Sequence, residues 1–189
     1  MAWGRSSSAE AGFSLTETLV SVGILAAVSL GVAQMFAVAT DANRAAQVTT
    51  SAATLAAQKM EQLRGLTWGF DSQGLPVTDT TTNLANEPPT NDGRGLNPSP
   101  GGTLDANTPG YVDYLDRSGA WVGTGPTPPP NAIFIRRWSV DPLPTNPNNT
   151  LVLQVLVTTV AREAARGSGP KQRLPGDAWI VSVKTRKAP

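Results

Sequence analysis

Glu17 is an acid at the start of an apolar segment, and its position points to specific chemistry. It follows closely on Gly12 and Phe13, and no further charged residue appears before Asp41. An ionisable group at the edge of a membrane-spanning segment is costly and usually has a partner of opposite charge. The placement therefore predicts that Glu17 has a partner, because a charge removed from water is tolerable only when it is paired.

A second set of oxygen-bearing side chains follows part of the spacing of a calcium-binding loop, D-x-[DN]-x-[DN]-G-x5-E. Pro109 replaces one ligand of that pattern, and an aspartate stands where the pattern has its bidentate glutamate. Turns rich in Asp and Asn are also common in loops that bind no metal. The candidate calcium ligands are Asp105, Asn107, Asp113 and Asp116.

The chain contains neither cysteine nor histidine among its 189 residues. This composition excludes disulfides, thiolate nucleophiles, Ser-His-Asp relays and zinc sites built from imidazole or thiolate. A catalyst would need carboxylates, a serine with a lysine, or a bound metal. Lys59 and Lys184 lie in segments predicted as helix and strand, and neither can be matched with a serine. We therefore expect that the protein is not an enzyme and has no resident cofactor.

The formal net charge of +1 offers no basic field for nucleic acid or anionic lipid. The residues from about 18 to 40 are almost all apolar or small, and about 20 such residues suffice for a helix to span a bilayer. Small side chains within this span would let another helix pack closely. They are Gly23, Ala26, Ala27, Gly31 and Ala33.

The N-terminus has three interpretations. A secretory signal cleaved after Ala39 would release a soluble domain, but its apolar core would exceed the usual ~7–15 residues. An uncleaved signal anchor would leave Glu17 without a purpose. The third interpretation is cleavage between Gly12 and Phe13, ahead of the apolar segment.

The run Gly12-Phe-Ser-Leu-Thr-Glu-Thr-Leu-Val20 resembles the class III signal of type IV prepilins and pseudopilins. The resemblance implies a leader peptide over residues 1–12, removed by a prepilin peptidase that also methylates Phe13. It implies that Glu17, the fifth residue of the mature chain, neutralises the terminal amine of a neighbouring subunit. Two features depart from the usual pattern, since the cation nearest to Gly12 is Arg5 and Gln34 stands where major pilins often have proline.

By this resemblance the chain is most similar to V-type minor pilins, which are structural subunits of a pilus or of its initiating complex. A minor pseudopilin of a type II secretion or DNA-uptake machine shares every motif and remains an alternative. The implied partners are the prepilin peptidase, the inner membrane, and other pilins that contact the N-terminal helix. The implied location is the bacterial inner membrane, crossed once with the N-terminus cytoplasmic and the C-terminal domain periplasmic, and then the pilus or pseudopilus.

The elements that must position these residues begin with one long helix over 13–65. Beyond the apolar span, apolar side chains recur at steps of three and four, which is the period of an amphipathic helix. Arg64 and Gly65 suit a helix C-terminus. We expect the apolar side chains to pack against strands: Ala45, Val48, Ala52, Leu55, Ala56, Met60 and Leu63.

Residues 66–131 are rich in Pro, Gly, Asn, Asp and Thr and predict a long, partly ordered loop. We expect aromatic side chains to pin it to the domain, namely Trp68, Phe70, Tyr111, Tyr114 and Trp121.

Residues 132–189 then alternate with the period of strands and predict an antiparallel meander. Phe134, Trp138 and Val140 share one face of the first strand. Leu151, Leu153, Val155 and Val157 share a face of the second, and Trp179, Val181 and Val183 share a face of the third. Arg136 and Arg137 point to opposite faces and are expected at solvated positions. The predicted fold class is α+β and pilin-like, with the long helix packed on a small sheet.

Overall fold

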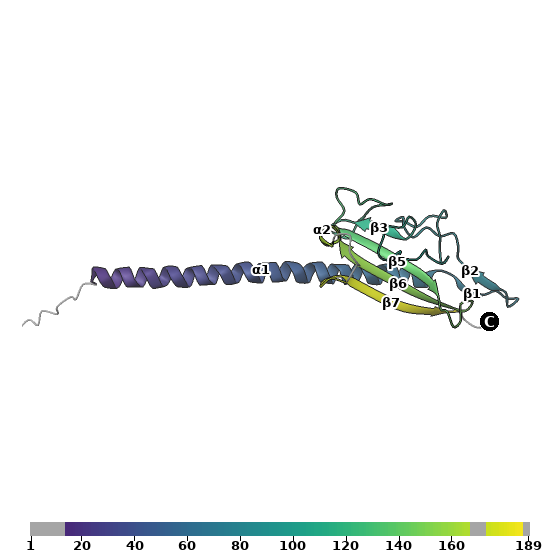
Figure 1. Cartoon of the computed structure of the whole chain (residues 1–189), viewed down its shortest axis with the longest axis horizontal. Coiled ribbons are helices and arrows are strands. Elements are labelled where there is room, and N and C mark those ends of the chain that lie inside the picture. Colours follow the sequence, from purple (N-terminus) through teal and green to yellow (C-terminus); the bar gives the residue numbers. More distant parts are fainter. Residues whose placement is uncertain (1–13, 167–172, 187–189) are drawn as a thin grey trace, which may run out of the picture. The chain divides into compact units, whose positions relative to one another are not determined.

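A computed structural model describes residues 14–166 and 173–186 of the chain (Figure 1). The chain divides into two compact units, residues 1–44 and 45–189. One helix, α1 (Leu15–Gly65), supplies the described elements of the first unit and continues into the second. The predicted helix over 13–65 is thus observed from Leu15 onward.

In the first unit α1 is a single apolar helix whose described side chains are all exposed. Ser14 begins it, since the Ser14 hydroxyl accepts a hydrogen bond from the backbone N–H of Glu17 at 3.2 Å. The helix is long and apolar enough to cross a membrane. No proline or glycine-rich stretch interrupts it, so the backbone hydrogen-bonding groups are satisfied within the helix, as hydrocarbon requires.

The second unit is built around a five-stranded antiparallel sheet with the order β4-β3-β5-β6-β7. Its strands are β3 (Val112–Leu115), β4 (Trp121–Thr124), β5 (Phe134–Pro142), β6 (Thr150–Thr159) and β7 (Ala178–Thr185). A separate hairpin pairs β1 (Trp68–Phe70) with β2 (Pro76–Thr78), and the short helix α2 (Val160–Ala165) follows β6. The predicted meander corresponds to β5, β6 and β7.

The core of this unit lies between the C-terminal part of α1 and one face of the sheet (Figure 1). Of the seven helix side chains predicted from the periodicity, Ala45 is exposed and Val48 is half-buried. The other five are buried: Ala52, Leu55, Ala56, Met60 and Leu63. The sheet contributes the predicted faces of β5 and β6: Phe134, Trp138, Val140, Leu151, Leu153, Val155 and Val157. The layout is α+β, with one long N-terminal helix and an antiparallel sheet.

Residues 66–131 are more regular than the loop expected there. β3 and β4 extend the sheet beyond β5, and all four residues of β3 are buried. The irregular segment between β2 and β3 packs onto the main core through Leu84, Ala85 and Leu96. Of the five predicted aromatic pins, Tyr111 and Tyr114 are almost fully buried, and the other three are half-buried.

The predicted apolar face of β7 points away from the core. Trp179, Val181 and Val183 are each at least half exposed, whereas Ile180 packs against the main core. The register explains this arrangement, because Ile180 lies opposite Val155, a core residue of β6. The long helix that was expected to pack on the sheet therefore does not cover Trp179, Val181 and Val183.

Candidate functional site

The predicted processing residues Gly12 and Phe13 lie outside the described residues. Glu17 lies in the first turn of α1 and is exposed. Ser14 and Glu17 stand three residues apart in the pattern of a capping box, in which a glutamate supports the start of a helix. A negative charge in the first turn also stabilises a helix through its dipole. Glu17 thus supports the start of the helix, and a role in assembly would be additional to this local one.

The helix surface beside Glu17 carries large apolar side chains in solvent, from Leu15 at 82 % exposure to Val38 at 70 %. Gly23 and Gly31 are open, since a methyl group added at either position would meet no atom within 4 Å. With Ala27 between them they form a repeat of small residues at every fourth position, which permits close helix contact. This surface suits hydrocarbon or other apolar helices as its surroundings.

Three of the four calcium candidates are engaged in other contacts, and Asp105 is exposed. Asn107 accepts two hydrogen bonds from Arg137, and Asp113 is buried in ion pairs. Asp116 accepts hydrogen bonds from Ser118 and from the backbone N–H of Ala120, within its own turn. Across residues 14–166 and 173–186, no three or more acidic groups are arranged to hold a metal ion.

The buried carboxylate of Asp113 pairs with two cations, Lys59 of α1 and Arg136 of β5. Lys59 Nζ lies 2.9 Å from Asp113 Oδ2 and donates to the carbonyl oxygen of Leu84 at 2.6 Å. Arg136 binds the same carboxylate with two hydrogen bonds, from Nε at 2.8 Å and from Nη2 at 2.7 Å. All three side chains are at most 3 % exposed. The ammonium of Lys59 also lies 4.6 Å from the centre of the Trp138 ring.

Burial lowers the pKa of Lys59 from 10.5 to about 8. The carboxylate of Asp113 opposes this shift, and the positive charge of Arg136 adds to it. Charges taken out of water are expensive unless they are paired and hydrogen-bonded. The cluster ties α1 to β3 and β5, because its members come from these three elements.

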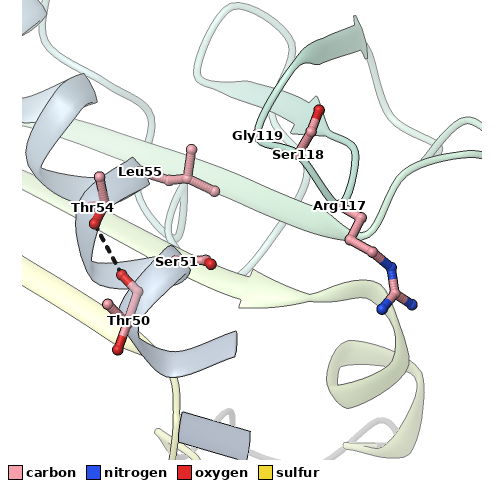
Figure 2. A pocket seen from close by; sticks show the side chains of 7 residues that line it. All are labelled: Thr50, Ser51, Thr54, Leu55, Arg117, Ser118 and Gly119. Carbon is pink, nitrogen blue, oxygen red and sulfur yellow. Dashed lines mark hydrogen bonds between the residues drawn. The ribbon is translucent and has the colours of Figure 1, made fainter. Parts of the chain in front are cut away.

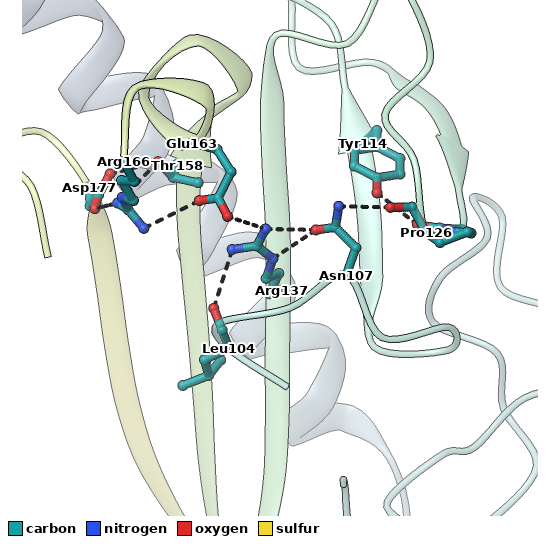
Figure 3. A network of polar contacts seen from close by, with 10 residues as sticks. Leu104, Asn107, Tyr114, Pro126, Arg137, Thr158, Glu163, Arg166 and Asp177 are labelled. Carbon is teal, nitrogen blue, oxygen red and sulfur yellow. Dashed lines mark hydrogen bonds and ion pairs between the residues drawn. The ribbon is translucent and has the colours of Figure 1, made fainter. Parts of the chain in front are cut away.

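A second polar network lies around Arg137 (Figure 3). Arg137 donates to Asn107 Oδ1 at 2.9 and 2.7 Å and to Glu163 at 2.9 Å, which links β5 to the loop before β3 and to α2. Arg166 contacts both Glu163 and Asp177. Asn107 in turn donates to the carbonyl oxygen of Pro126 at 3.0 Å.

These contacts correct the expectation for the two strand arginines. Arg136 and Arg137 do point to opposite faces, but both are buried and each has carboxylate and backbone partners within the chain. The sequence predicted solvated positions for both residues because arginines without a partner of opposite charge are rarely buried. Asp113 and Glu163, the acids that compensate for their burial, lie more than 20 residues away in the sequence.

The sequence did contain a signal for the burial of Lys59. Residue 59 lies four positions after Leu55 and four before Leu63, so the same periodicity places it on the buried face of α1. The residue type concealed this, since lysine on a helix is ordinarily solvated.

The seam between α1 and the β3–β4 turn is hollowed (Figure 2). One pocket there is lined by Thr50, Ser51, Thr54 and Leu55 of the helix and by residues 117–119 of the turn. Thr50 and Thr54 donate their hydroxyl hydrogens to carbonyl groups of the preceding helical turn. Ser118 donates to Asp116 in the same way. These hydroxyl hydrogens are thus used within their own elements.

Comparisons of this chain with protein-family models, with curated proteins and with solved structures gave no match. Inference about function therefore rests on the residues themselves. The N-terminal segment combines an exposed apolar helix with a single acid, whereas the charge clusters of the second unit hold its elements together.

Proposed function

We propose that this protein is a minor type IV pilin, a structural subunit that enters a membrane-anchored filament or the complex that initiates it. The observation that carries the proposal is the N-terminal segment of α1. Glu17 is its one charged residue between Leu15 and Thr40, and its apolar side chains are exposed throughout. A long apolar surface of this kind indicates an apolar environment or apolar partners.

The motif from Gly12 to Val20 supports cleavage before Phe13 and methylation of the new N-terminus. The cleaved chain would begin with an ammonium group four residues ahead of Glu17. Two such chains packed side by side in a low-dielectric environment would each present one cation and one anion. Because an unpaired charge there costs several kcal/mol, pairing Glu17 with the amine of a neighbour would select the correct axial register.

A minor pseudopilin of a secretion or DNA-uptake machine would use the same chemistry. The two functions differ in the subunits with which the helix packs. Identification of the proteins cross-linked to the N-terminal part of α1 in the native membrane separates them.

The test is the substitution Glu17→Gln in the full-length protein in its native membrane. Glutamine keeps the length of the side chain and its place in the capping box while removing the charge. We expect incorporation into the filament or initiating complex to fall about tenfold or more, because the neighbouring amine loses its partner. Quantitative immunoblotting of the sheared or cross-linked assembly measures this, and intact mass in the same samples reports cleavage and methylation at Phe13.

The matched control is Glu61→Gln, which neutralises an exposed acid on the same helix, and it should leave incorporation unchanged. Glu17→Asp should retain most of it. Normal incorporation of Glu17→Gln would contradict the assigned role of the charge. A mature protein that begins near Thr40 would overturn the pilin proposal and favour a secreted domain.

A further inference from the structure

The strand β7 forms one edge of the five-stranded sheet (Figure 1). It pairs with β6 in an unbroken register over all 8 of its residues, and no other strand in the described part of the chain pairs with it. The β1–β2 hairpin lies at the end of β7, where Arg186 donates to the carbonyl oxygens of Gly69 and Val77. The side of β7 that faces away from β6 is therefore an open edge.

The backbone groups on this open edge belong to Trp179, Val181 and Val183. The N–H of Arg186 donates to the carbonyl oxygen of Asn149, on the side of β6. Residues of an antiparallel strand alternate between those whose N–H and C=O face one neighbour and those whose groups face the other. Counting back from Arg186, the groups of Trp179, Val181 and Val183 face away from β6. Within residues 14–166 and 173–186, no backbone hydrogen bond reaches them.

The same three residues also present apolar side chains to solvent. Trp179 and Val181 are each 50 % exposed, and Val183 is 59 % exposed. Edge strands are usually protected against pairing by proline, by a bulge or by charges. β7 has neither a proline nor a bulge, and its one charged residue, Lys184, lies near its end and donates to the carbonyl oxygen of Arg64. The central part of the edge is thus suited to pairing with another strand.

We propose that β7 pairs antiparallel with β7 of a second copy of this chain, about a two-fold axis at Val181. This register places Trp179 opposite Val183 of the other copy, and an aromatic residue opposite a β-branched one is a favourable cross-strand pair. Val181 lies opposite its own counterpart, and Lys184 lies opposite Ala178, so no like charges meet. The outward N–H and C=O groups of all three apolar residues gain partners. The edge is therefore self-complementary, as a two-fold interface requires.

The size of this interface indicates where it forms. One strand pair is small beside the roughly 1,200–2,000 Å² of a standard protein interface. We therefore expect weak association in dilute solution and stable association where a membrane holds the chains at high local concentration. The pairing requires neither cleavage before Phe13 nor the charge of Glu17, so this proposal and the pilin proposal can fail separately.

Single cysteines test the register, because the chain has none of its own. The full-length chain carries Val181→Cys and is mildly oxidised in its native membrane. The two copies of residue 181 would have Cα atoms about 5.5 Å apart, which is within the range of a disulfide. We expect a covalent dimer whose intact mass is that of two copies of the chain.

The matched control is Val183→Cys, on the same face of the same strand. In the proposed register the two copies of residue 183 lie four positions apart along the strands, which is about 13 Å. The yield of its covalent dimer should therefore be at least tenfold lower than that of Val181→Cys.

A mixture of Trp179→Cys and Val183→Cys chains provides a second test, because these positions lie opposite each other. We expect mixed dimers in excess over both homodimers. Adding Val181→Lys to both chains should lower the yield of mixed dimers at least tenfold, since two ammonium groups would meet at the axis. Adding Val77→Lys, on β2 and away from the open edge, should leave the yield unchanged. Thermal unfolding of Val181→Lys should match that of the unaltered chain, which separates lost pairing from lost structure.

Four results contradict the proposal. The first is a Val181→Cys chain that remains monomeric after oxidation. The second is an equal yield from Val181→Cys and Val183→Cys, which random collision would produce. The third is an unchanged yield of mixed dimers with Val181→Lys. The fourth is a disulfide-linked product whose mass includes a different protein in place of the second copy, which would assign the open edge to a strand of another subunit.

Discussion

Lys59 is a buried cation of the second unit, and its surroundings affect the stability of the domain. Its ammonium is enclosed by Asp113, the carbonyl oxygen of Leu84 and the face of Trp138, and it has no exposed surface. Removing one partner of such a cluster leaves an uncompensated charge in the interior. Lys59 therefore couples the stability of the domain to pH.

The pKa of Lys59 is about 8 in the folded chain against 10.5 for an ordinary lysine. Between these values the unfolded chain holds a proton that the folded chain has released, so the free energy of unfolding rises with pH. Burial raises the pKa values of Tyr111 and Tyr114 from 10.0, which opposes the gain above that pH. We expect a net rise of about 2 kcal/mol from about pH 8 to about pH 10.

Urea unfolding across this range measures the effect. Lys59→Met should flatten the profile, while Arg64→Met, which removes an exposed cation from the same helix, should leave the slope intact. A slope that persists in Lys59→Met would assign the pH dependence to another group.

At the level of elements, the alternating pattern predicted each strand of the meander. It did not predict which face of every strand is buried. Period-two alternation identifies the two faces of a strand without saying which is buried. β5 and β6 have one clearly apolar face, whereas β7 has apolar residues on both, with Ile180 on one and Val181 on the other. The choice depends on the register with β6, which is a tertiary property.

β3 was missed for a related reason. Its Asp113 interrupts an apolar run, and aspartate is more typical of a loop than of a buried strand. Its burial is tolerable only because it pairs with Lys59 and Arg136. The candidate site followed the same rule. The signal around Glu17 was visible because it is local, whereas the cluster of Lys59, Asp113 and Arg136 is assembled from residues far apart in the sequence and was not predicted.

The outward face of β7 leads to a prediction about two valines. Val181→Thr should change the free energy of unfolding by less than about 0.5 kcal/mol, since its side chain is 50 % exposed. Val155→Thr, the same substitution on the buried face of β6, should cost about 1–3 kcal/mol because it buries a hydroxyl group. Denaturant unfolding of both variants measures the difference. Equal costs would place Val181 in the core and contradict the register.

At the scale of the whole molecule, the two units differ in what stabilises them. The first unit buries none of its described residues and is a single helix that suits a membrane or a bundle of helices. The second unit contains both apolar clusters, and the earliest residue in either cluster is Val48. Both buried arginines and Lys59 also find their partners within this unit. Its stability should therefore be independent of residues 14–44 of the chain.

The corresponding prediction is that a fragment of residues 45–189 folds without detergent. A domain of this size buries enough of its surface to be stable alone. We expect a single cooperative thermal transition by circular dichroism, within a few degrees of the transition of the full chain in detergent, because residues 14–44 contribute nothing to either apolar cluster. Deleting residues 45–58 as well should abolish the transition, since Ala52, Leu55 and Ala56 leave the core. An unfolded 45–189 fragment would show instead that the N-terminal part of α1 contributes to the folding of the domain, and the division at Arg44 would have no energetic meaning.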